Sequence, residues 1–157
     1  MSPCIFPFNN KLKGLIHRMK KLTEEHNMDN ISRTNAYANY YERNREITWA
    51  YLASFVSRNA GWNMADLHSK PFKTLLSVKQ RLFIFTTYER ANWLIFSDAY
   101  PQLLIYEESK RRGIPLFSLL RHFHVSRWMI KEWFRFWYEK NPIRLIQAQI
   151  INEQYVI

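Results

Sequence analysis

Apolar side chains recur along this chain three and four residues apart, and no stretch alternates clearly between apolar and polar positions. The first spacing is typical of amphipathic α-helices, whereas strict alternation would indicate strands. The pattern therefore predicts an all-α fold. The expected helices span about 10–26, 34–41, 46–59, 72–97, 98–112, 116–122, 127–140 and 143–157.

The helix boundaries follow from residues that start or stop helical backbone. Ser32 or Thr34 can cap the second helix, because a side-chain oxygen accepts a hydrogen bond from the first turn. Gly61 is placed to end the third helix in a left-handed conformation. Asp98 and Pro101 fit the cap and first turn of a new helix, since proline is tolerated there.

The predicted helix 72–97 has an unusual middle. From residue 82 onward its only charged side chains are Glu89 and Arg90, and large apolar residues point in nearly every direction. A helix that is apolar all round is usually buried. We therefore predict a single bundle-like domain of several helices around this long apolar helix. Residues 1–30 would form an N-terminal amphipathic helix and residues 31–157 the helical domain.

The last predicted helix carries an apolar stripe to the end of the sequence. The stripe consists of Ile143, Ile146, Ile150 and Ile151. Two interpretations are open: residues 143–157 bind a second copy or another protein, or the helical domain is truncated at its C-terminal end. Under the first interpretation this stripe is the partner-binding surface.

Charge and composition narrow the class of protein. The 157 residues include 23 Lys and Arg against 13 Asp and Glu, which makes the chain basic with a formal net charge of +10. The charges are spread evenly, which is more typical of solubility than of a nucleic-acid-binding tail. No apolar run approaches the roughly 20 residues of a membrane span, and the first residues do not fit a secretory signal. With a single cysteine, these features predict a soluble cytoplasmic protein.

Several chemistries need residues that this sequence lacks. Its three glycines, at positions 14, 61 and 113, do not form a glycine-rich phosphate loop. One cysteine and five scattered histidines do not form a zinc motif. We therefore expect no metal site and no cofactor. A non-enzymatic role is favoured, with an enzyme left open.

A set of polar residues stands in apolar surroundings and forms the candidate site. Glu89 shares a helical face with Phe85 and Trp93, where an isolated carboxylate would be costly. We predict that eight residues converge into one buried network: Arg58, Asn59, Asn63, Asp66, Glu89, Arg90, Asn92 and Asp98. A structural network that fixes helix packing is favoured. A small-molecule or enzymatic pocket around Glu89 is the alternative, because perturbed charges gather at both kinds of site.

Residues 116–138 resemble a degenerate helix-turn-helix unit, which makes nucleic-acid binding an alternative function. Arg127, Lys131 and Arg135 would form a basic stripe that faces phosphates. Two positions depart from the motif, because Leu120 stands where a small residue is usual and His124 where glycine is usual. We favour an ordinary helical hairpin with a solvated basic face and its aromatic side chains in the core.

Four longer strings are specific enough to indicate a family. They are SRTNAYANYY (32–41), EITWAYLASFVSRNAGWNMADL (46–67), ERANWLIFSDAYPQLLIYEESK (89–110) and FHVSRWMIKEWFRFW (123–137). These strings resemble the YppC-like family of uncharacterised proteins from Bacillus-type bacteria, with a domain of unknown function, over roughly residues 31–157. The resemblance implies no activity, cofactor or catalytic residue. It does imply a longer protein, of which this chain resembles the N-terminal half.

Overall fold

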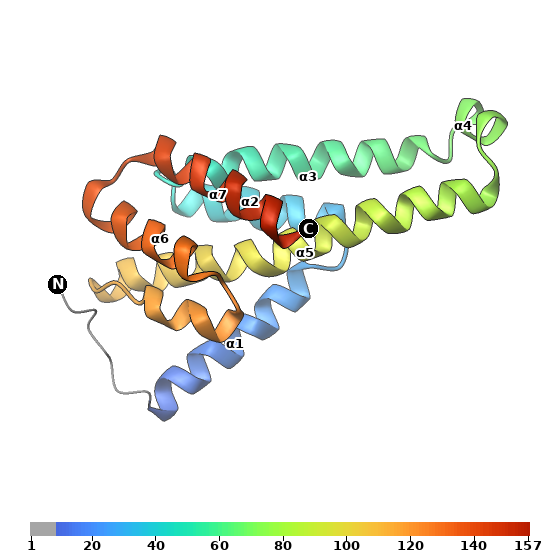
Figure 1. Cartoon of the computed structure of the whole chain (residues 1–157). Helices are drawn as coiled ribbons and strands as arrows, with labels where there is room; N and C mark the ends of the chain where they lie inside the picture. Colours follow the sequence, from blue (N-terminus) through green and yellow to red (C-terminus); the bar gives the residue numbers. More distant parts are fainter. Residues whose placement is uncertain (1–8) are drawn as a thin grey trace.

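The computed structural model describes residues 9–157, and every regular element within them is helical. The elements are α1 (Asn10–His26), α2 (Asn30–Arg43), α3 (Thr48–Asp66), α4 (Lys70–Leu75), α5 (Val78–Arg112), the 3₁₀-helix η1 (Phe117–Phe123), α6 (Arg127–Glu139) and α7 (Pro142–Val156). The predicted all-α fold is confirmed, and the helices form one domain (Figure 1).

The C-terminal half of α5 forms the centre of this domain. Residues 99–106 of α5 are all buried, and α1, α2, η1 and α7 pack against this helix. An aromatic cluster joins α5, η1 and α6, where the ring centroid of Trp133 lies 5.5 Å from those of Tyr106 and Phe117. The apolar stripe of α1 belongs to the same core, so the N-terminal amphipathic helix is part of this domain.

Side chains close the N-termini of several helices, although not always the predicted ones. Ser126 accepts a hydrogen bond from the backbone N–H of Met129 at 3.1 Å and so caps the start of α6. The predicted cap of α2 at residue 32 or 34 is wrong. Asp29 takes this role, because its carboxylate accepts a hydrogen bond from the N–H of Ser32 at 2.7 Å. The polar stretch that begins at Asp29 is therefore the first turn of α2, not a loop.

The predicted stop at Gly61 is also wrong, since α3 continues to Asp66. A Cβ atom at Gly61 would lie 3.2 Å from the Cβ atom of Asn30, which is tighter than ordinary packing. The glycine therefore permits the close approach of α2 and α3 and does not end the helix. As a result, the polar residues that follow Gly61 lie along a projecting helix and not at a helix end.

The predicted break at Asp98 and Pro101 does not occur, because α5 runs through both residues. A proline inside a helix removes one backbone hydrogen bond and is normally costly. The carbonyl that loses its helical donor is that of Ser97. Asn27 donates to the carbonyl of Trp93 at 3.1 Å and Gln102 donates to that of Asp98 at 3.1 Å, so these bonds support the adjacent turns and do not replace the missing one. Tertiary packing around the buried Pro101 thus outweighs its local preference.

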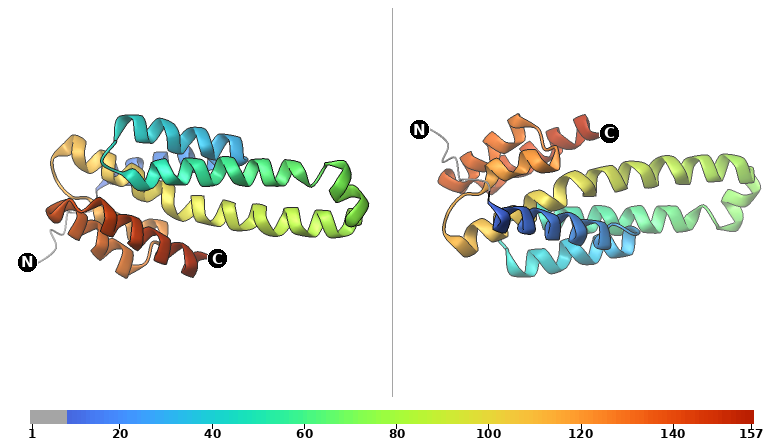
Figure 2. Two further views of the ribbon diagram at one scale, coloured as in Figure 1. Left: turned by 90° about the horizontal axis from the view of Figure 1, so that it is seen from above. Right: turned by 90° about the horizontal axis from the view of Figure 1, so that it is seen from below.

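The segments on either side of α4 form a long hairpin that projects from the other helices (Figures 1 and 2). Residues 58–93, here called the arm, comprise the last part of α3, all of α4 and the first part of α5. Only Met64 and Leu67 of the arm are buried. The arm therefore extends beyond the hydrophobic core.

The predicted central position of helix 72–97 is wrong for most of its length. The helical backbone is interrupted at Leu76 and Ser77, between α4 and α5. Within residues 72–97 only Phe96 is buried. Because α5 is continuous, its first turns project beyond the helices that surround its second half (Figure 2). The long helix is central, but the half with the most apolar sequence is the exposed one.

Candidate functional site

The eight polar residues predicted to converge do not form one network. Five of them are exposed: Arg58, Asn59, Asn63, Asp66 and Arg90. The guanidinium carbon of Arg58 lies 4.6 Å from the ring centroid of Phe55 and 5.0 Å from that of Trp62, on the surface of α3. The prediction failed because α3 runs on through Gly61 and carries these side chains into the arm.

Glu89 is paired, but with a residue outside the predicted set. Both of its carboxylate oxygens accept hydrogen bonds from Nη2 of Arg33 at 2.8 Å. Arg33 is only 1% exposed, and it also donates to Asn27 and Asn30 at 3.0 Å. Asn92 donates to Asn30 at 3.4 Å, so this first network joins α2 and α5.

Asp98 belongs to a second network that joins α5, α6 and α7. It accepts hydrogen bonds from Gln102 at 2.7 Å and from Asn152 at 2.6 Å. Gln102 in turn accepts hydrogen bonds from Nε1 of Trp133 at 2.7 Å and from Gln149 at 2.9 Å. Burial raises the pKa of Asp98, and the two donated hydrogen bonds oppose that rise. The structure thus brings Glu89 and Asn92 together and places Asp98 in a separate cluster.

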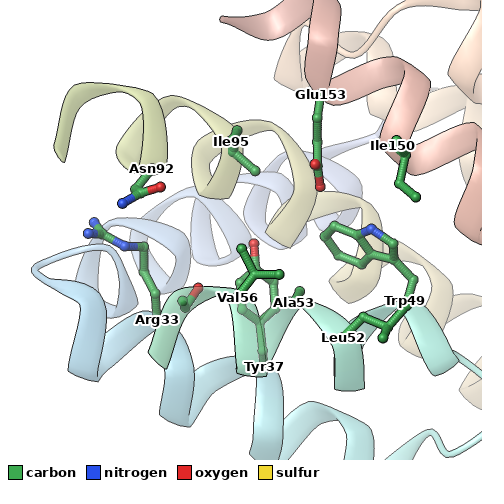
Figure 3. Close-up of a pocket in the computed structure, with 11 residues that line it drawn as sticks. Arg33, Tyr37, Trp49, Leu52, Ala53, Val56, Asn92, Ile95, Ile150 and Glu153 are labelled. Carbon is green, nitrogen blue, oxygen red and sulfur yellow. The ribbon is translucent and has the colours of Figure 1, made fainter. Parts of the chain in front are cut away.

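A cavity of about 230 Å³ lies between α2, α3, α5 and α7. Figure 3 shows its walls, with α5 and α7 on one side and α2 and α3 on the other. Its lining is mostly apolar and comprises Arg33, Tyr37, Trp49, Leu52, Ala53, Val56, Ser57, Asn92, Ile95, Ile150 and Glu153. A concave apolar site with a few polar groups is the usual form of a ligand pocket.

Glu153 points from α7 into this cavity, towards the wall formed by α2 and α3 (Figure 3). Burial, together with the nearby charge of Asp98, raises the pKa of Glu153 to about 7. Its side chain makes no hydrogen bond or ion pair within residues 9–157. The sequence analysis missed Glu153, although it follows Ile146 and Ile150 on one apolar stripe, which is the same signal that singled out Glu89.

The predicted basic stripe lies on the surface of α6. Arg127, Lys131 and Arg135 are exposed. Nε of Arg135 lies 3.9 Å from Oε1 of Glu139. The preceding element is a short 3₁₀-helix and not the α-helix of a helix-turn-helix unit. His124 does adopt the left-handed turn conformation, with φ of 62°.

Core placement of the aromatic side chains of α6 is correct only in part. Trp133 and Phe136 are buried, whereas Trp128 and Tyr138 are exposed. Phe134 and Trp137 are partly buried and pack against the core, so only two of the six aromatic side chains of α6 are exposed.

The arm exposes a large number of apolar side chains. The exposed ones are Trp62, Phe72, Leu75, Val78, Leu82, Phe83, Phe85, Tyr88 and Trp93. Four of them are more than 60% exposed on α4 and α5 alone: Leu75, Val78, Leu82 and Phe83. Many exposed apolar side chains on one projecting segment are typical of an interaction site.

No group of three His, Cys, Asp or Glu side chains in the described part of the chain is arranged to hold a metal ion. Over the same residues, none of the helices combines the length and apolar character needed to cross a bilayer.

Residues 25–157 match the family described as "Protein of unknown function (DUF2515)". The chain belongs to this family. It is 57% identical over 146 residues to "Uncharacterized protein YppC" of Bacillus subtilis (strain 168), which confirms the resemblance found in the sequence. The family has no assigned function, and no solved structure matches the chain.

The match to YppC covers 93% of this chain but 46% of the relative. The chain therefore spans about half the length of the relative, and more than half of YppC lies outside the match.

Proposed function

We propose that this chain is a non-enzymatic interaction module whose arm binds a polypeptide. The proposed occupant is the part of the family's longer protein that this chain does not match. The observation that carries the proposal is the projecting, apolar, almost wholly unburied arm. We further propose that the protein acts in the cytoplasm, where a single unpaired cysteine is expected to stay reduced.

Exposure of the arm's apolar side chains to water is unfavourable in free energy. Leu82 is 63% exposed and Phe83 is 72% exposed, and covering either side chain would release roughly 1–2 kcal/mol. Val78 and Leu82 are one turn apart on the same face of α5, and Phe83 lies about 100° further round the helix. Several such side chains covered together supply enough free energy for a stable helix-on-helix interface.

The C-terminal helix extends this surface towards the body of the domain. One face of α7 is buried by Leu145 and Ala148, while Ile143, Ile150 and Ile151 remain exposed. Ile150 also lines the cavity beside the α3 residues that lead into the arm. We therefore include the exposed face of 143–157 in the proposed partner surface, whereas Ile146 packs against the core and is left out.

The choice of occupant rests on length and on surface chemistry. YppC contains more residues outside the match than inside it, and those residues are attached to the same kind of helical segment in the relative. A covalently linked segment has a high effective concentration, so it needs less affinity than a separate protein does. A second copy of the chain is the competing occupant.

Co-expression of this chain with the unmatched part of YppC tests the proposal. We expect the two polypeptides to purify as a one-to-one complex, with the mass measured by light scattering. Replacing Leu82 and Phe83 together by serine should weaken the complex at least about tenfold, because each loses over 1 kcal/mol of apolar contact. Both side chains are exposed, so the variant should keep the stability of the isolated chain.

Tyr138→Ser is the matched control, because Tyr138 is 66% exposed but lies on α6, away from the arm. It should leave the complex unchanged. If the polypeptides do not associate, or if the two variants weaken the complex equally, the arm is not the binding surface. A dimer of this chain that dissociates in the Leu82 and Phe83 variant would identify a second copy as the occupant instead.

A further inference from the structure

The cavity at the base of the arm contains one carboxyl group that has no hydrogen-bond or ion-pair partner among residues 9–157. Glu153 comes from α7, and the wall opposite is formed by Tyr37, Trp49 and Val56 from α2 and α3 (Figure 3). Trp49 is 4% exposed and Tyr37 is 2% exposed, so both rings are held rigidly by the core. Most of the side chains around Glu153 in the cavity are apolar, and within residues 9–157 no cation forms an ion pair with it.

The charge balance around the cavity is acidic. Its walls carry three titratable or charged groups, Arg33, Tyr37 and Glu153. Arg33 is neutralised by its two-oxygen contact with Glu89 at 2.8 Å, and Asp98 lies close enough to Glu153 to repel its charge. Once that pair is formed, no cation on α2, α3, α5 or α7 that lines the cavity compensates Glu153.

We propose that this cavity binds a small apolar primary amine, whose ammonium group pairs with the carboxylate of Glu153. The apolar part of the ligand would lie against Ile95, Ile150 and the indole ring of Trp49. A cation beside an aromatic face is further stabilised by the negative face of the ring, most strongly by that of tryptophan. Ile150 belongs both to this cavity and to the proposed partner surface, so the inference is tested on the isolated chain.

The size of the cavity limits the ligand. At roughly 30 Å³ for each water-sized group, 230 Å³ accommodates about eight non-hydrogen atoms. Phenethylammonium, a phenyl ring on a two-carbon amine, is close to this size. Two compounds of the same shape, 2-phenylethanol and phenylacetate, replace the cation by a neutral and an anionic group.

Binding of the amine should increase with pH. Burial raises the pKa of Glu153 to about 7, so the carboxylate that the ammonium needs is present mainly above this pH. Affinity for phenethylammonium should therefore increase by about tenfold from pH 6 to pH 8, while the amine itself stays protonated. Tyr37 does not titrate in this range, because burial raises its pKa well above the usual value.

The test is a titration of the isolated chain with the three probes, followed by the NMR signal of the Trp49 indole N–H. We expect phenethylammonium to bind at least about tenfold more tightly than 2-phenylethanol. Glu153→Gln should abolish this preference and the pH dependence. Glu24→Gln, which changes an exposed carboxylate on α1, should alter neither.

Each other outcome overturns the proposal. Equal binding of the amine and the alcohol would show an apolar pocket in which Glu153 has no role. Tightest binding of phenylacetate would assign the site to the free Nε of Arg33, which has no hydrogen-bond partner within residues 9–157. No saturable binding of any probe by the wild-type chain would show that the cavity is not a ligand site. The pH dependence of phenethylammonium binding to the wild-type chain tests the proposal even if the Glu153 variant is poorly folded.

Discussion

The side chain of Gln102 holds three helices together, and its removal should destabilise the domain strongly. Gln102 is fully buried in α5, where its Oε1 accepts one hydrogen bond from Trp133 on α6 and one from Gln149 on α7. Gln102→Leu keeps a similar volume but removes this acceptor. The substitution leaves two buried donors without a partner, and each costs roughly 1–3 kcal/mol.

We therefore expect Gln102→Leu to lower the free energy of unfolding by about 3–4 kcal/mol. For a chain of this size, that corresponds to a fall in Tm of roughly 10 °C. Urea denaturation followed by circular dichroism measures the change. The slope with denaturant should stay constant, because the substitution does not alter the surface exposed on unfolding.

A double-mutant cycle separates the hydrogen bonds from the loss of volume. Gln149→Leu should cost only about 1 kcal/mol, because Oε1 of Gln149 has no partner within residues 9–157 and its removal offsets part of the loss. The double variant should cost at least about 1 kcal/mol less than the sum of the two single variants. Gln147→Leu, at an exposed position on α7, is the control and should have little effect. Additive effects, or a loss below about 1 kcal/mol for Gln102→Leu, would refute the reasoning.

Three further predictions concern other parts of the chain. Arg33→Met should lower the free energy of unfolding by about 3 kcal/mol, because it leaves Glu89 unpaired at 28% exposure, whereas Arg45→Met at an exposed ion pair should have no measurable effect in the same denaturation assay. The pKa of Glu153 is about 7 in the folded state and 4.5 when unfolded, so the free energy of unfolding falls progressively as the pH rises from about 4.5 to 7 and is constant above that. Glu153→Gln should therefore be more stable than the wild type by roughly 3 kcal/mol at pH 8 and equally stable near pH 4, as pH-dependent denaturation would show. Gly113→Ala should lower the free energy of unfolding by about 1 kcal/mol in thermal denaturation. Residue 113 ends α5 with φ of 72°, which alanine adopts unfavourably, although an added Cβ atom would contact nothing.

Helix content and most of the core could be predicted from apolar spacing, because that spacing reflects which face of a helix is covered. The failures arose where tertiary contacts outweigh local preferences. Gly61 was interpreted as a helix end, but its missing Cβ atom serves the contact with Asn30 on α2. Pro101 was interpreted as a helix start, but the packing and hydrogen bonds around it keep α5 continuous.

The candidate site was predictable only in its general character. The cost of an isolated carboxylate correctly indicated that Glu89 is paired. Its partner Arg33 could not be identified, because the expected helix 34–41 leaves Arg33 out, whereas the cap at Asp29 places it in the first turn of α2. Likewise, an apolar sequence over residues 82–97 indicates that the helix needs cover, but it does not say whether this chain supplies that cover.

Chemical accessibility of the arm tests the central claim most directly. The measurement compares the rate of thiol labelling at Phe83→Cys in two molecules that both carry Cys4→Ser: this chain alone, and YppC with its matched segment replaced by this chain. Lys11→Cys, at an exposed position on α1, provides the control. We predict that labelling at position 83 is at least about tenfold slower in the longer protein, because a free energy of more than about 1.4 kcal/mol for covering the arm corresponds to a tenfold lower exposed population. Labelling at position 11 should stay constant. Equal rates at position 83 in the two molecules would contradict the proposal that the rest of the family's protein covers the arm.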